Sequence, residues 1–152
     1  MSYNVTESRL TTEELMKVLM EERNLSGFLH SNDTEIGLPA FSEYLEKLRK
    51  AKGEPAEKII LRGNIEKSYG HQIFRGTRKP SRDTVLKLAF GFEMDVEDAQ
   101  KMLRTAGMSM LYPRVLRDAV VIYSLHNHVS VVDTEIILQQ LDLPLLSRDG
   151  SL

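Results

Sequence analysis

The sequence predicts an all-helical protein. Its apolar residues recur mostly at helical intervals of three and four positions, and the strict alternation that marks a half-buried strand is nearly absent. No internal repeat or low-complexity tract is visible. With 152 residues, 41% hydrophobic and 28% charged content, the chain is expected to form one compact domain with appendages.

The first predicted helix lies in an amino-terminal arm. Thr11 and Glu14 have the spacing of a capping box, in which each side chain bonds the backbone N–H of the other residue, and an apolar stripe continues to about Glu22. Residues 24–39 are rich in Ser, Asn, Asp and Gly, which predicts a linker or a loosely packed arm. We therefore assign residues 1–38 to a short N-terminal helix and its linker.

Five helices are predicted in residues 39–107. Ser42 suits the N-cap of the first, which ends near Gly53, and Pro55 suits the first turn of the second. The second helix is short, and its apolar residues are Ile59, Ile60 and Leu61.

A sharp turn is predicted after the second helix. Gly63 and Asn64 both tolerate the left-handed backbone that such a turn requires. The third helix then spans about residues 66–75 and ends at Gly76, with three side chains directed toward a core: Tyr69, Ile73 and Phe74.

The fourth and fifth helices have clear start signals. Ser81 is the expected N-cap of the fourth helix, and Asp83 lies in its first turn, where the helix dipole favours a negative charge. Asp95 is the expected N-cap of the fifth helix, which ends at Gly107.

Two further helices are predicted in a C-terminal extension, residues 108–152. One follows Pro113, and the other begins at a Ser130 cap and ends before Pro144. Both are more apolar than a lone helix pair can bury, so they are expected to complete the core or to form an interface. A homodimer is the hypothesis that follows.

The charges are segregated along the chain. The formal net charge is −2, yet Lys and Arg outnumber Asp and Glu by 14 to 10 in residues 41–107. Within residues 62–82 the cations are Arg62, Lys67, Arg75, Arg78, Lys79 and Arg82, and Glu66 is the one acidic residue, which gives a local balance of 6 − 1 = +5. Such a patch on an acidic chain indicates an anionic partner at one face.

Several other classes of protein are not expected. The chain has no cysteine, and it has no apolar run near the roughly 20 residues that span a bilayer. The polar, acidic amino terminus does not look like a secretory signal, which favours a cytoplasmic protein with no membrane contact. His126 and His128 do not share a helix face, so a helix end is expected there rather than a metal site. No catalytic constellation and no cofactor motif is found, so the protein is not expected to be an enzyme.

Residues 41–107 resemble the Cro/cI-type, or xenobiotic-response-element, family of DNA-binding proteins. The resemblance lies in FSEYLEKLRKAKG, NIEKSYGHQIFRGTRKPS and RDTVLKLAFGF. It implies a lambda-repressor-like fold: a five-helix helix-turn-helix domain, here with an N-terminal helical arm and a C-terminal helical extension. The implied function is sequence-specific binding of double-stranded DNA by a transcriptional regulator, as a repressor, with no cofactor.

The resemblance also implies which residues contact DNA. The helix at about residues 66–75 would enter the major groove, and its base-reading residues would be Lys67, Ser68 and Gln72, with His71 close by. Gln can pair with adenine through two hydrogen bonds, and Lys can donate to guanine. The phosphate contacts would be Arg75, Arg78, Lys79 and Arg82.

Four positions depart from the family pattern. Ile60 stands where a small residue is usual, and Gly70 stands where a branched apolar residue is usual. Asn64 replaces a glycine in the turn, and Glu66 places a negative charge at the start of the third helix. The alternative function is that of an antitoxin-like or adaptor protein, which would bind a protein partner through the acidic N-terminal arm.

Overall fold

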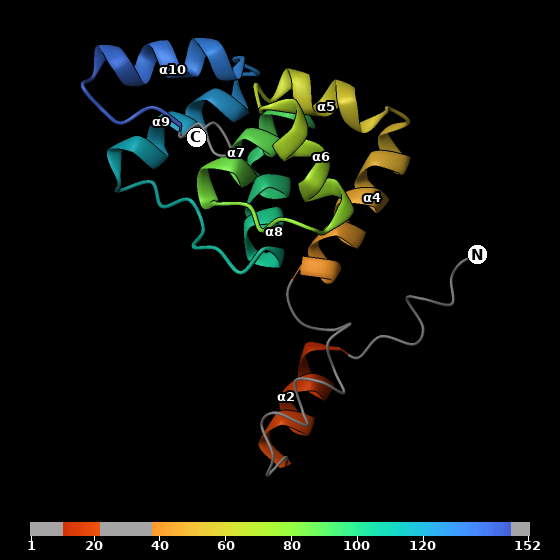
Figure 1. Ribbon diagram of the computed structural model, residues 1–152. Helices are drawn as coiled ribbons and strands as arrows, with labels where there is room; N and C mark the ends of the chain where they lie inside the picture. The colour runs from red at the N-terminus through yellow and green to blue at the C-terminus, as the bar shows by residue number, and fades with distance from the viewer. Residues whose placement is uncertain (1–10, 22–37, 147–152) are drawn as a thin grey trace. The chain divides into compact units, whose positions relative to one another are not determined.

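The computed structural model describes residues 11–21 and 38–146, and in these ranges the secondary structure is helical without a strand (Figure 1). The described helices are α2 (Thr12–Glu21), α4 (Leu38–Lys52), α5 (Ala56–Arg62), α6 (Lys67–Arg75), α7 (Arg82–Gly91), α8 (Val96–Thr105), α9 (Leu116–His126) and α10 (Val131–Gln140). The prediction of an all-helical protein is confirmed for these residues. The chain forms two compact units, Met1–Ala40 and Phe41–Leu152. The predicted linker falls mostly in residues 22–37, outside the described ranges.

The helix starts follow the predicted caps. The Thr11 hydroxyl accepts from the Glu14 amide at 3.0 Å, and the Glu14 carboxylate accepts from the Thr11 amide at 2.8 Å, which completes a capping box at α2. The side chains at the N-caps of α7, α8 and α10 each accept a bond from an amide in the first turn; these residues are Ser81, Asp95 and Ser130.

Three helix boundaries differ from the sequence prediction. Helix α4 begins at Leu38, so that Ser42 lies inside the helix and does not cap it. Pro39 is tolerated there because the first turn of a helix has no partner for the N–H that proline lacks. Pro55 is the extended N-cap of α5 rather than a helical residue, and Val115 has the same place before α9.

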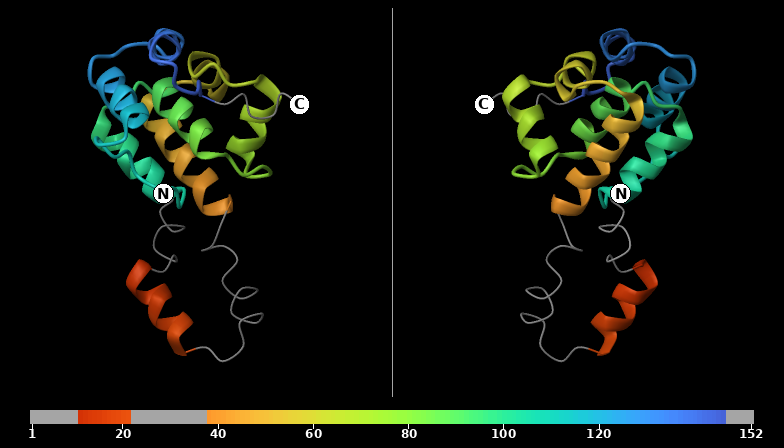
Figure 2. Two further views of the ribbon diagram at one scale, coloured as in Figure 1. Left: turned by 90° about the vertical axis from the view of Figure 1, so that its left-hand side faces the viewer. Right: turned by 90° about the vertical axis from the view of Figure 1, so that its right-hand side faces the viewer.

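Helix α7 is the centre of the second unit (Figures 1 and 2). Every residue from Thr84 to Gly91 is buried, and α7 packs against both α5 and α8. The approach to α5 is closest at Gly91, where an added Cβ would lie 2.3 Å from the Ile59 carbonyl oxygen. Glycine at this position therefore sets the distance between α5 and α7.

The described part of the C-terminal extension belongs to the same unit. Helix α9 packs against α8, and α10 packs against α9. Side chains from both extension helices and from the segment after them join the core that α7 centres on, and they include Val121, Leu125, Val131, Leu138 and Leu146. The expectation that this extension completes the core is therefore met.

None of the described helices is long and apolar enough to cross a bilayer.

Candidate nucleic-acid interface

Helices α5 and α6 are joined by a tight turn at residues 63–66. Asn64 has the left-handed conformation, with φ 56°, as the sequence predicts. Gly63 does not: its φ is −79° and its ψ is −2°, which any residue can adopt. Glycine is required there for space, because a Cβ would lie 2.7 Å from the Lys87 carbonyl oxygen. The turn thus packs directly on the central helix.

Two departures from the family pattern compensate for each other. A Cβ at Gly70 would lie 2.8 Å from both Cγ atoms of Ile60, and Ile60 itself is 2% exposed. The large side chain on α5 therefore fills the space that the missing side chain on α6 leaves. A large side chain on α5 thus faces a glycine on α6.

The start of α6 is capped by an acid. The Glu66 carboxylate accepts from the Tyr69 amide at 2.8 Å and from the Ser68 amide at 3.0 Å. These backbone bonds lower the pKa of Glu66, so its negative charge is kept at the positive end of the helix dipole. The arrangement stabilises the helix and disfavours an anion beside its first turn.

The outward face of α6 is not covered by the described helices. In the left view of Figure 2, α6 lies at one edge of the second unit, with the other helices of that unit on one side of it. Lys67 and Ser68 are exposed, and His71 and Gln72 are half-buried. Lys67 also lies 3.5 Å from the Glu57 carboxylate, and both side chains are largely exposed. The structure therefore brings all four predicted base-reading residues to one helix.

The end of α6 carries a positioned arginine. Gly76 terminates the helix with φ 80°, and the chain turns back so that Arg78 lies over the Tyr69 ring, 5.0 Å from its centroid. An Arg78 Nη also donates to the Gln72 side-chain oxygen at 3.3 Å. The ring and the amide hold the guanidinium beside α6, while Arg78 stays exposed.

Arg82 has a different role from the one that the resemblance implies. Its guanidinium bonds both carboxylate oxygens of Asp118, at 3.2 and 3.0 Å, and also the carbonyl oxygens of Ser109 and Met110. Asp118 is 6% exposed. Arg82 therefore holds the C-terminal extension against α7, and its guanidinium is already bonded within the fold. Its partners lie 27 to 36 residues away, and no local pattern marks them.

The charged patch is smaller in three dimensions than in the sequence. Arg62 is paired with Glu54, and this hydrogen bond lowers the pKa of the Glu54 carboxyl. The cations of residues 62–82 that are exposed and have no carboxylate within ion-pair distance in the described part of the chain are Arg75, Arg78 and Lys79. All three lie at the end of α6 or directly after it.

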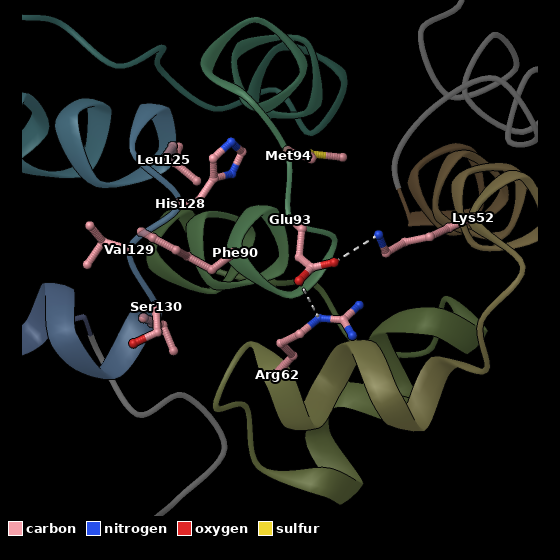
Figure 3. A pocket seen from close by; sticks show the side chains of 10 residues that line it. Lys52, Arg62, Phe90, Glu93, Met94, Leu125, His128, Val129 and Ser130 are labelled. Carbon is pink, nitrogen blue, oxygen red and sulfur yellow. Dashed lines mark hydrogen bonds and ion pairs between the residues drawn. The ribbon is translucent and has the colours of Figure 1, made fainter.

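A pocket of about 530 Å³ lies elsewhere in the second unit, between the end of α7 and the α9–α10 turn (Figure 3). Its apolar wall includes Phe90, Met94, Leu125, Val129 and Val131. Glu93 also lines the pocket, where one of its carboxylate oxygens lies 3.2 Å from the Lys52 Nζ and the other lies 3.9 Å from the Arg62 Nε. Because these cations already face carboxylates, the pocket presents no uncompensated charge that would define a ligand class.

No metal site is found in the described ranges, since no three His, Cys, Asp or Glu side chains come together there. His126 ends α9, and His128 follows with a left-handed backbone, φ 57°, so the expected helix end is confirmed.

No protein-family model, no curated protein and no solved structure matches the chain. The class that the described residues define is an all-helical protein with an exposed short helix flanked by cations.

Proposed function

We propose that α5 and α6 form a Cro/cI-type helix-turn-helix and that the protein is a DNA-binding transcriptional regulator, a repressor, rather than an enzyme. The observation that carries this proposal is the uncovered face of α6, with Lys67 and Ser68 exposed at its start and cations at its end. A major groove is wide enough to admit a helix presented in this way.

In this proposal, the two ends of α6 have different tasks. Lys67, Ser68 and Gln72, with His71 beside them, contact base edges, where the amide of Gln72 can pair with adenine and Lys67 can donate to guanine. Arg75, Arg78 and Lys79 contact phosphates, which fix the position of the protein but carry no sequence information. The cap at Glu66 supports this division because it disfavours phosphate at the first turn.

Selection of bound sequences from random duplex DNA, at stated salt, tests the proposal. We expect a defined site to be enriched, and Gln72→Ala to relax the preference at one position by about 1–3 kcal/mol of discrimination, because a paired base contact is lost. Lys79→Ala, at an exposed cation that does not contact Gln72, is the matched variant: it should weaken all sequences alike and lower the slope of log K against log salt by about one for each bound chain.

If the full chain binds no duplex in a salt-dependent way, and a protein partner is lost when residues 1–38 are removed, the adaptor function is correct instead. The exposed apolar side chains of α2, among them Met16 and Met20, favour that second function.

We further propose that the chain acts as a homodimer through the C-terminal extension. In described residues 41–107 the large apolar side chain that is exposed is Leu61, whereas residues 108–146 expose Met110, Tyr112, Val115, Leu116, Tyr123, Val132, Ile136, Leu141 and Leu145. Val132 and Ile136 are four residues apart on α10 and share a face. A second copy that packs on α10 would cover Val132 and Ile136, leave residues 108–115 uncovered, and present two α6 helices to paired half-sites.

Light scattering at high micromolar concentration tests the dimer. We expect the mass of two chains for the native protein and of one chain for Ile136→Glu, because a buried charge in the interface is not compensated. Leu61→Glu, an exposed apolar position on α5, is the control and should remain dimeric. A monomeric native protein would remove the dimer from the proposal.

A further inference from the structure

The α8–α9 loop, residues 108–115, is held in place by side chains of three helices. Arg82 on α7 bonds the carbonyl oxygens of Ser109 and Met110 at 2.9 and 3.1 Å. Gln100 on α8 bonds both backbone groups of Leu111, at 2.7 and 2.9 Å. Four backbone groups of residues 109–111 are thus fixed without regular secondary structure.

The third helix completes the support. The Asp118 carboxylate on α9 accepts from the Tyr112 amide at 3.0 Å, and the Val115 amide then closes a turn onto the Tyr112 carbonyl at 3.0 Å. The Leu111 side chain is 3% exposed and anchors the loop in the core. The four residues of the loop tip, 112–115, are exposed.

The loop is bonded to the start of α7, which follows the cationic end of the candidate interface in the sequence. Its anchor, Arg82, is the first residue of α7 and comes three positions after Lys79. Residues 106–115 contain no acidic residue, and their one charge is that of Arg114. Arg114 is exposed, and no ion pair or hydrogen bond of its guanidinium is found within the part of the chain that the structure describes.

We propose that the α8–α9 loop is an additional phosphate-binding segment and that Arg114 contacts the DNA backbone beyond the track of Arg75, Arg78 and Lys79. The inference rests on the proposed DNA binding. A tip fixed by three helices presents its arginine with little loss of backbone entropy, and the planar guanidinium suits a phosphate. Arg82 itself is bonded to this loop and to Asp118, so it positions the segment that carries Arg114.

Fluorescence anisotropy of a mixed-sequence duplex of about 30 base pairs with the full chain tests this inference, because non-specific binding reports phosphate contacts alone. Arg114→Gln should lower the slope of log K against log salt by about 0.9 for each bound chain, so the affinity lost between about 50 and 200 mM salt should be about 3.5-fold smaller per chain. Arg114→Lys keeps the charge and should keep the slope. Two further variants are the controls. Arg78→Gln removes a phosphate contact that is already proposed, and Lys47→Gln removes an exposed cation of α4 outside the candidate interface.

The variants separate the possible failures. An unchanged slope in Arg114→Gln, together with a reduced slope in Arg78→Gln, overturns the inference and leaves DNA binding intact. An equal reduction in Lys47→Gln and Arg114→Gln also overturns it, because net charge alone would then account for the effect. If the native chain shows no salt-dependent binding, the proposed function itself fails. Matching melting temperatures establish that the exposed substitutions have not unfolded the protein.

Discussion

Replacement of Ile60 by alanine is expected to lower the free energy of unfolding by about 2–5 kcal/mol, because it opens a cavity between α5 and α6. Ile60 is 2% exposed, and the facing Gly70 has no side chain that could fill the space. Gly70→Val should also lower the free energy of unfolding, by about 1–3 kcal/mol. The Cβ of the new side chain would already lie 2.8 Å from both Cγ atoms of Ile60.

The double variant Ile60→Ala, Gly70→Val gives the decisive measurement. It places the small residue on α5 and the branched residue on α6, so each change relieves the defect of the other. Urea unfolding of the four proteins should give a coupling energy of about 1 kcal/mol or more in favour of the double variant. Strictly additive losses would contradict the exchange of bulk between the two helices.

Replacement of Asp118 by alanine is expected to cost about 3 kcal/mol, because breaking one side of a buried ion pair leaves the other charge uncompensated. Asp118 accepts two bonds from Arg82 and one from the Tyr112 amide, so the change also releases the α8–α9 loop. Arg117 and Asp83 form a second ion pair, in which the arginine lies on α9 and the acid on α7. The two Arg117 Nη atoms donate to the two carboxylate oxygens of Asp83, each at 3.0 Å. Two adjacent residues of α7 thus form ion pairs with two adjacent residues of α9.

A surface pair provides the matched control for that substitution. Arg49 and Glu46 also make two hydrogen bonds, at 3.0 and 2.9 Å, but they lie one turn apart on α4 and are more exposed. Glu46→Ala should therefore change the unfolding free energy far less than Asp118→Ala. Thermal unfolding of both variants checks the difference, and equal losses would show that the α7–α9 connection is not a stabilising contact.

Local sequence signals predicted the helices and most of their starts. The Ser81 and Asp95 caps act over three residues, and each is satisfied within its own turn, so reading them needs no knowledge of the fold. Ser42 does not cap α4, because the helix begins four residues earlier, at Leu38. Pro39 suits the first turn of this longer helix. Gly63 was predicted for its conformational freedom, whereas its contact with Lys87, on another helix, requires its small size.

Local signals were enough to predict the all-helical class, most of the caps and the position of the exposed helix α6, because backbone hydrogen bonding and apolar periodicity act over a few residues. Tertiary structure alone decided which cations are free for a partner. Arg82 follows Arg78 by four residues, yet it is bound to Asp118, 36 residues away, while Arg78 remains exposed. A long charged side chain takes the acceptor that folding brings within reach, and the linear order of residues does not specify that acceptor.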